Sequence, residues 1–288
     1  MFGLRSDGRK IKTIDPIMKL TPHIMPDRND AMVMSMYEIN CGYLDEYIFK
    51  KRKESNIRFN YMNILIASFV RTMAVRPKIN RFIMNGRVFA RKDISVSFIV
   101  KKQLVDTAEE ETIKLTFKGT ENIYEIKEMM DAEIAKNTTK TSHNDTDSLA
   151  KALTLVPNFL IKFMVGFLKM LDKHGLLPKS IINLSPFHTS IFLTNLRSIK
   201  MNYAYHHIYN FGSTSIFVAM GKEQYEPRVK DAEENTFGSE KVMKAGIVID
   251  ERICDGLYYG NSVRELMKYL VDPSLLENNL EAKVEDIK

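Results

Sequence analysis

One short stretch of the chain carries charged side chains at a spacing suited to proton transfer. Residues 247–260, IVIDERICDGLYYG, begin as an apolar strand and lead to Glu251 and, four residues later, to Asp255-Gly256. A carboxylate in a turn after a buried strand has the position of a general acid–base group in a cleft. An ion pair of Glu251 with the adjacent Arg252, or with another cation, explains the same pattern without chemistry.

A second group of reactive side chains lies in the aromatic run YAYHHIYNFG, residues 203–212. If this segment is extended, the adjacent His206 and His207 point to opposite sides, one into a cleft and one into the core. Imidazole suits a general base because its unperturbed pKa of about 6.5 lies near neutral pH. A buried, hydrogen-bonded aromatic cluster is the alternative explanation.

The elements that must position these residues follow from the hydrophobic pattern. Alternation of apolar and polar residues predicts strands, and apolar residues at helical spacing predict helices. The Asn85-Gly86 pair is a strong hairpin signal. Strands are predicted at residues 31–40, 81–84, 87–92, 93–103, 111–119, 189–196, 213–224 and 241–252. Helices are predicted at residues 42–54, from 60 to just before Pro77, at 122–138 and 158–171, and from 260 to near Pro273. This mixture predicts an α/β sandwich around a mixed sheet.

Composition restricts the class of protein. With 288 residues and 44% hydrophobic content, the chain can bury one large core or two modest ones. The net charge of +6 comes from basic residues that are spread along the chain, which favours an anionic ligand such as a phosphorylated cofactor over nucleic acid. Cys41 and Cys254 are far apart and have no metal-ligand spacing, which fits a reducing cytoplasm.

The longest apolar segment, NFLIKFMVGFLKML at residues 158–171, contains Lys162 and Lys169. It is too short to cross a bilayer, which needs roughly 20 residues. The pattern predicts a helix packed on a core or at a subunit contact, and a helix lying on a membrane surface is the alternative. The polar residues 138–148 predict a loop, and the last dozen residues are expected to fray.

The order of these motifs resembles the catalytic domain of the dihydrolipoyl acyltransferases, the core subunits of 2-oxo acid dehydrogenase complexes, and of the related chloramphenicol acetyltransferases. Residues 250–256, DERICDG, are similar to the family pattern D-H-R-x-x-D-G. Residues 189–196, TSIFLTNL, resemble the strand T-F-T-I-S-N-L, and residues 60–100 are similar to the family's helix, hairpin and following strand. The resemblance spans residues 17–276 and implies a chloramphenicol acetyltransferase-like two-layer sandwich, with a mixed sheet and helices on one face.

The resemblance gives Glu251 the position of the family's catalytic histidine. That histidine takes a proton from the thiol or hydroxyl that attacks a thioester. A carboxylate has a reference pKa of about 4.3, so that it is a weaker base than imidazole by nearly 3 kcal/mol, roughly two pKa units. Glu251 is therefore either a working base or a structural carboxylate, and His206 or His207 could supply the base instead.

Other family positions carry over with it. Thr194 aligns with the family's serine, which stabilises the developing oxyanion. If the register slips by one residue, Asn195 aligns with that serine instead. Asn195 and Ser190 are expected to contact the cofactor. Asp255 is expected to brace the site through a salt bridge and Gly256 to permit a tight turn, and Arg252 has a structural role.

The resemblance also implies ligands and partners. Coenzyme A or an acyl-CoA is the expected substrate, without a metal, at a site between the subunits of a homotrimer. Because the resemblance begins near residue 17, we expect no lipoyl domain on this chain, and a lipoyl-bearing or dehydrogenase-complex partner is expected instead. The predicted organisation is an N-terminal arm (1–16), an acyltransferase-like domain (17–276) and a polar C-terminal tail (277–288).

Two functions compete on this basis. The first is acyl transfer between coenzyme A, or another acyl thioester, and a thiol or hydroxyl acceptor. The second is a catalytically inactive structural or regulatory homologue that keeps the fold and the trimer, which the replacement of histidine by Glu251 motivates. A nucleic-acid or membrane-surface role carried by the basic charge is a third, weaker hypothesis.

Overall fold

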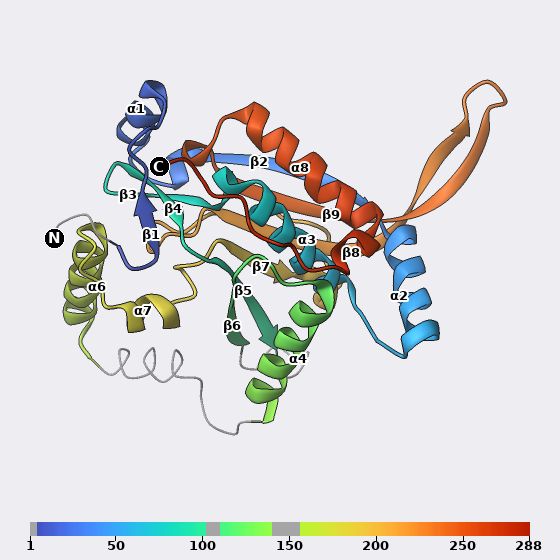
Figure 1. The fold of residues 1–288 in the computed structure, drawn as a ribbon, viewed down its shortest axis with the longest axis horizontal. Helices are drawn as coiled ribbons and strands as arrows, with labels where there is room; N and C mark the ends of the chain where they lie inside the picture. The colour runs from blue at the N-terminus through green and yellow to red at the C-terminus, as the bar shows by residue number, and fades with distance from the viewer. Residues whose placement is uncertain (1–4, 102–109, 140–155) are drawn as a thin grey trace.

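The computed structural model describes residues 5–101, 110–139 and 156–288. Its larger sheet has the strand order β2-β9-β8-β7-β5-β6 (Figure 1). The strands are β2 (Met32–Asn40), β5 (Ile94–Lys101), β6 (Glu110–Phe117), β7 (Ile191–Asn195), β8 (Ile216–Asp231) and β9 (Thr236–Asp250). Because β7 runs parallel to β5 and β8 whereas the other neighbours are antiparallel, the sheet is mixed, as the sequence predicts.

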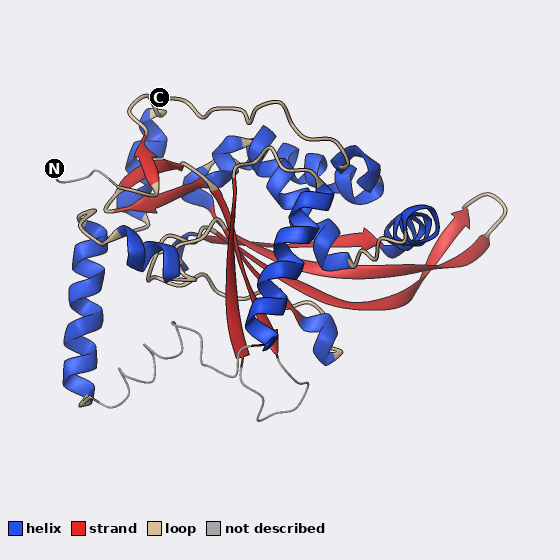
Figure 2. Cartoon of the chain, turned by 60° about the horizontal axis from the view of Figure 1, so that its bottom comes forward, coloured by secondary structure: helices blue, strands red, loops and turns tan. Residues whose placement is uncertain are grey.

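Helices cover one face of this sheet (Figures 1 and 2). They are α2 (Cys41–Ser55), α3 (Tyr61–Val75), α4 (Ile123–Thr139) and α8 (Gly256–Val271). Helix α3 is almost entirely buried and begins with a capping box between Asn60 and Asn63. Ile216, Val218 and Met220 of β8 join the same hydrophobic core. The predicted two-layer sandwich with helices on one face is confirmed.

The opposite face of the sheet carries a smaller apolar cluster and an extended segment. Phe192, Phe217 and Val248 pack there with Ile208 of the crossing segment, which we define as residues 201–209. A Cβ on Gly246 would lie 2.2 Å from the carbonyl oxygen of Ala204. Glycine therefore allows the crossing segment to lie directly on the backbone of the sheet.

A three-stranded sheet lies beside the first, in the order β1-β4-β3. It consists of β1 (Gly8–Lys10), β3 (Arg81–Met84) and β4 (Arg87–Arg91). Asn85 and Gly86 between β3 and β4 both have positive φ, 51° and 66°, as a two-residue hairpin turn of the primed type requires. The hairpin predicted from the Asn-Gly pair is confirmed.

The β8–β9 hairpin is much longer than the sequence indicates. The predicted strands, residues 213–224 and 241–252, are here Ile216–Asp231 and Thr236–Asp250, and their far ends project from the body (Figure 1). Tyr225, Val229 and Phe237 are exposed on this projection. Alternation of apolar and polar residues marks a strand only where one face is buried, so a hairpin solvated on both faces leaves no such pattern.

Both ends of the described chain pack against the body. Ile11 and Ile14 are buried in the main core, and the amide of Val284 donates to the carbonyl of Ala74. Arg81 binds Asp286 through two hydrogen bonds of 2.6 Å, with both side chains nearly buried. The expectation that the last residues fray is therefore wrong, because specific polar partners hold them.

The described residues form further, mostly shorter helices. They are α1 (Pro16–Ile24), α6 (Asn158–Lys173), α7 (Lys179–Leu184) and the short turns η1 (Asn29–Ala31), η2 (Pro77–Asn80), η3 (Leu196–Ile199), η4 (Glu251–Ile253) and η5 (Pro273–Leu276). Figure 2 shows α6 standing at one side of the body.

Helix α6 confirms the helix predicted at residues 158–171. Phe159, Phe163 and Phe167 are exposed, so that no core formed by the described residues covers its apolar face. A subunit contact there stays a prediction. Among the described residues, no helix is long and apolar enough to cross a membrane. Of the loop predicted at residues 138–148, the part from residue 140 lies outside the described residues.

Replacement of Asp286 tests the packing of the C-terminal residues. An Asp286→Ala variant leaves the Arg81 guanidinium buried without its carboxylate, which is expected to lower the free energy of unfolding by about 3 kcal/mol. Urea unfolding measures this loss. The control is Asp131→Ala, which removes the half-exposed partner of Lys127 and should cost less than about 1 kcal/mol. Equal, small losses for both variants would show that the end of the chain is not held.

Candidate active site

A buried ion pair fixes the turn that follows β9. The Arg252 guanidinium donates to both carboxylate oxygens of Asp250 at 2.7 Å, and both side chains are almost completely buried. Arg252 also donates to the carbonyls of Met25 and Pro26, which follow α1. The expected structural role of Arg252 thus has a physical basis, and its partner is Asp250. No ion pair between Arg252 and Glu251 is formed.

Glu251 lies in η4, exposed at the edge of a cavity of about 270 Å³. Met18 of α1, Met25 directly after that helix and Tyr259 of α8 also line this cavity. Its walls are mostly apolar, and the Glu251 carboxylate supplies a charge at the rim. A carboxylate beside an apolar cleft can accept a proton from a bound thiol or hydroxyl group.

Asp255 and Gly256 begin helix α8. The Asp255 carboxylate accepts a hydrogen bond of 2.8 Å from the amide of Tyr258 and so caps the helix. Gly256 is the first helical residue, has no positive φ, and has free space where a Cβ would stand. The geometry therefore supports a capping role for Asp255 in place of the expected salt bridge, and it does not require glycine at position 256.

The remaining polar groups of the cavity are not nucleophiles. Burial raises the pKa of Cys254 to about 12, so that its side chain is a neutral thiol at physiological pH. The Tyr259 hydroxyl lies 2.7 Å from the Ser35 hydroxyl, and burial also raises the pKa of Tyr259. Two carboxylates line this cavity, Glu251 and Asp255. Asp255 is engaged in capping α8, which leaves Glu251 as the better candidate for proton transfer.

The polar residues of β7 lie away from that cavity. Ser190 precedes the strand and is buried, with its hydroxyl accepting a hydrogen bond of 3.0 Å from the amide of Ser95. Thr194 and Asn195 are half-buried at the end of the strand, and the buried Oδ1 of Asn195 has no hydrogen-bond partner among the described residues. Ser190 thus joins two strands, whereas Thr194 and Asn195 remain at the surface of the sheet.

Strand register separates Thr194 from Glu251 within one chain. Thr194 pairs with Ala219, and Ala219 pairs with Gly246 of β9. Gly246 lies five residues before Glu251, which corresponds to about 17 Å along a strand. A hydroxyl and a carboxylate this far apart cannot act on the same carbonyl group, so the two side chains do not form a site within a single chain.

His206 and His207 lie on the other face of the sheet. The ring of His206 stacks on Phe217, with the ring centres 3.9 Å apart, and its Nδ1 bonds the carbonyl of His207 at 2.8 Å. Phe217 pairs with Val248 of β9. The side chains of Val248 and of the next residue, Ile249, point to opposite faces of the sheet. Ile249 lines the Glu251 cavity, so neither histidine serves that cavity within the chain.

Comparisons with known proteins match this architecture through structure. No protein-family model and no curated protein matches the sequence. A probable dihydrolipoamide acetyltransferase from Listeria monocytogenes is 12% identical, with a TM-score of 0.55 over 91% of this chain and 94% of that one. A chloramphenicol acetyltransferase is 11% identical, with a TM-score of 0.54 over 91% and 99%. The chain has the chloramphenicol acetyltransferase-like fold.

Further structures with this fold include the dihydrolipoamide acetyltransferase of Azotobacter vinelandii, which is 10% identical with a TM-score of 0.55 over 92% of this chain and 93% of that one. The catalytic core of a 2-oxoacid dehydrogenase complex from Thermoplasma acidophilum is 11% identical, with a TM-score of 0.53 over 92% and 99%. At these identities the likeness establishes the fold, and function must be argued from the residues themselves.

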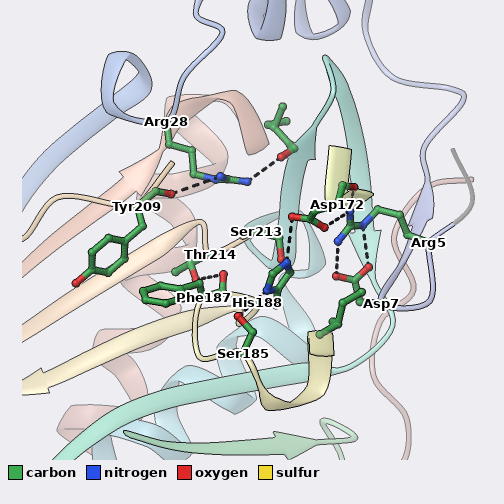
Figure 3. Close-up of polar contacts among 12 residues, drawn as sticks. Arg5, Asp7, Arg28, Asp172, Ser185, Phe187, His188, Tyr209, Ser213 and Thr214 are labelled. Atoms are coloured by element: carbon green, nitrogen blue, oxygen red, sulfur yellow. Dashed lines mark hydrogen bonds and ion pairs between the residues drawn. The ribbon is translucent and has the colours of Figure 1, made fainter. Parts of the chain in front are cut away.

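A chain of hydrogen bonds that the motifs did not predict links His188 to Asp172 and Ser185 (Figure 3). His188 Nε2 lies 3.0 Å from Asp172 Oδ2, and Nδ1 lies 2.8 Å from the Ser185 hydroxyl. These residue types serve nucleophilic catalysis elsewhere, but here the imidazole is fully buried, and Ser185 does not line the adjacent cavity that His188 borders. The arrangement joins α6 to the loop after α7.

Sequence reasoning also missed a second cavity on the other side of η4. It is lined by Arg28, Arg252 and the α6 residues Lys169 and Lys173. These cations come from three separate parts of the chain, and the two lysines share one helix, so no local motif marks them as a group. The i, i+4 spacing of the two lysines on an apolar helix was the single available signal.

Acidification is expected to destabilise the protein through His188. Burial lowers the pKa of His188 below its ordinary value of 6.5, against the opposing effect of Asp172. The unfolded chain therefore binds a proton at higher pH than the folded protein. The stability that the protein has with His188 neutral is therefore fully present above about pH 6.5, the unfolded pKa, and is lost as the pH falls toward the lower pKa of the folded state. Urea unfolding at a series of pH values measures this slope.

A His188→Gln variant should have a flatter dependence of stability on pH across this window. His206→Gln is the control, because burial also lowers the pKa of His206 but its ring is only partly enclosed, so that the slope should change less. An unchanged slope in His188→Gln would contradict the assignment.

Proposed function

We propose that the protein is an acyltransferase that moves an acyl group between coenzyme A, or another acyl thioester, and a thiol or hydroxyl acceptor. The observation that carries the proposal is the position of Glu251 at the rim of the cavity between α1 and α8, in a chain with the chloramphenicol acetyltransferase-like fold. The cavity is large enough for the acyl thioester end of a substrate, and its apolar walls suit an acyl group.

In this proposal the carboxylate of Glu251 is the general base. It takes the proton of the acceptor thiol or hydroxyl as the acceptor atom bonds to the thioester carbonyl carbon. The carbon–sulfur bond then breaks, and the leaving thiolate takes the proton back from the Glu251 carboxyl group. No metal or redox cofactor enters the step.

The oxyanion formed during this step needs a donor that the same chain does not bring near. The roughly 17 Å of strand between the positions of Thr194 and Glu251 supports a site completed by a second copy, in which the neighbour's Thr194 hydroxyl donates to the oxyanion. We therefore propose a homotrimer, or a multiple of it, with its active sites between subunits. Asn195, whose buried Oδ1 is unpartnered among the described residues, would contact the cofactor.

The active unit in this proposal is residues 17–276, with residues 5–16 of the arm (1–16) and the tail (277–288) packed on it. A lipoyl group carried by another protein is a suitable thiol acceptor, so a lipoyl-bearing or dehydrogenase-complex partner follows from the proposal. The buried free thiols of Cys41 and Cys254 are compatible with the cytoplasm as the compartment. Ser190 is buried and hydrogen-bonded to Ser95, so we do not propose it as a cofactor contact.

A second candidate function is a catalytically inactive homologue that keeps the fold and the trimer. One observation favours it: among the described residues, the Glu251 carboxylate has no second group that would orient it as a base, whereas Asp250 and Asp255 are both engaged in the turn. Replacement by histidine separates the two functions. If Glu251→His gains acyl transfer that the native protein lacks, the protein is the inactive homologue.

With a hydroxyl acceptor, acyl transfer is measured as the release of free coenzyme A from acetyl-CoA. With dihydrolipoamide as the thiol acceptor, a parallel assay measures the acetylated dihydrolipoamide that forms. The Glu251→Gln variant is expected to lower kcat by at least about 100-fold, the contribution of a general base. Binding of coenzyme A, measured by calorimetry, should change little because the amide keeps the size of the carboxylate.

The matched control is Glu234→Gln, at an exposed glutamate in the turn of the β8–β9 hairpin. Its activity should equal that of the native protein. The proposal fails if coenzyme A shows no saturable binding and no acyl-CoA releases free thiol, or if Glu251→Gln keeps the native rate.

A further inference from the structure

The cavity on the far side of η4 is larger than the one at Glu251, with a volume of about 420 Å³. The two cavities are divided by a single turn, because Glu251 lines one and the next residue, Arg252, lines the other. This second cavity lies between the β3–β4 hairpin, the residues that follow α1 and the last turn of α6. Its volume falls in the range of small-molecule sites.

The electrostatics of this cavity are dominated by a buried arginine without a counter-ion. Arg28 is 95% buried, and among the described residues no carboxylate lies within salt-bridge distance of it. Its guanidinium donates to the carbonyl of Ile83 at 2.9 Å and to that of Tyr209 at 3.4 Å, as Figure 3 shows, and its Nε has no partner there. Neutral carbonyls satisfy donors but do not neutralise a charge.

The neighbouring charged groups do not supply the missing carboxylate. Arg5 binds Asp7 and Asp172, at 2.9 and 2.7 Å, and Arg252 binds Asp250 at 2.7 Å. The carboxylates of Asp7, Asp172 and Asp250 are thus each already bound to a guanidinium other than that of Arg28. The local balance of charge around Arg28 is positive.

A second buried cation adds to this excess. Arg91 is attracted by Asp7 and Asp172, which already bind Arg5, and is repelled by Arg28 and Arg5. Its guanidinium donates to the hydroxyl and carbonyl oxygens of Ser213. Burial lowers the pKa of Arg28 to about 10 and that of Arg91 to about 9, and both stay protonated at neutral pH. An uncompensated buried charge is costly, and a bound anion would remove that cost.

Two lysines of α6 complete the cationic lining. Lys169 and Lys173 are four residues apart, so that they share one face of the helix, and both border the cavity. Asp172, between them, is bound to Arg5 and His188, and Asp27 at the mouth is exposed and therefore screened. Like charges four residues apart on a helix repel each other, and an anion bound near both would relieve this repulsion.

We propose that this cavity binds a phosphate ester, whose phosphoryl oxygens accept hydrogen bonds from Arg28 and are neutralised by Lys169 and Lys173. A guanidinium with an unused N–H is a strong donor to a phosphate oxygen, and lysine acts as a compensating point charge. The volume beyond the phosphoryl group leaves room for the rest of a small molecule. Phe211 and Pro26 give that part an apolar wall.

The site is distinct from the Glu251 cavity, and the inference does not require acyl transfer. The two cavities nevertheless share a structural connection, because Arg252 lines the anion site and holds the turn that carries Glu251. The ligand is either a free phosphate ester or the 3′-phosphate of coenzyme A. The same chemistry recognises both, and an experiment distinguishes them.

Calorimetric titration of the full chain with inorganic phosphate tests the site, at constant ionic strength set by sodium chloride so that general screening stays fixed. We expect saturable binding of one phosphate per chain. The double variant Lys169→Ala/Lys173→Ala should weaken it by about tenfold, since each exposed lysine contributes a partly screened charge. Arg28→Gln should abolish it.

Lys162→Ala is the matched control, because Lys162 is an exposed lysine of the same helix that does not line the cavity. It should bind phosphate as the native chain does. If Arg28→Gln does not fold, the lysine variants alone decide. Absence of saturable phosphate binding, or equal affinities in Lys162→Ala and the double variant, would overturn the proposal.

Comparison of coenzyme A with dephospho-coenzyme A identifies the source of the phosphate. If the double lysine variant weakens only coenzyme A, the 3′-phosphate occupies the site. If neither nucleotide is affected while phosphate binding falls, the ligand is a separate phosphate ester. In both cases the site is supported, whether or not the Glu251→Gln test supports acyl transfer.

Discussion

The buried ion pair between Asp250 and Arg252 is the interaction on which the rest of the structure depends. It closes the turn at the end of β9, and Arg252 extends the contact to the carbonyls of Met25 and Pro26. Removal of either partner would leave a buried charge uncompensated, at a cost of about 3 to 5 kcal/mol. The same turn directs Glu251 into one cavity and Arg252 into the other, so that one ion pair sets the geometry of both.

A second constraint comes from the alternation of side chains along the strands. Ile249 borders the Glu251 cavity on one face, whereas Val248 packs with Phe217 beneath His206 on the other. The histidines therefore cannot supply a base to that cavity from within the chain. Strand register also keeps the Thr194 hydroxyl away from Glu251 within the chain, which makes a neighbouring copy part of the proposed site.

The sequence predicts the elements with a buried face well and the others poorly. Helix α3, the Asn85-Gly86 hairpin and the mixed sheet follow from periodicity and turn chemistry, because burial imposes a pattern on the residues. The far half of the β8–β9 hairpin carries no such pattern. The role of Asp255 and the second cavity could not be predicted, because a helix cap and a cluster around Arg28 depend on side chains brought together by the fold.

Co-expression of two disabled chains tests the central claim most directly. One chain carries Glu251→Gln and the other Thr194→Val, and each alone should form inactive trimers. If the active site is built from Glu251 of one copy and Thr194 of its neighbour, randomly mixed trimers regain intact sites and about a quarter of the native acyl-transfer activity. A mixture as inactive as its parents would contradict the account, because each site within a single chain would then carry one of the two lesions.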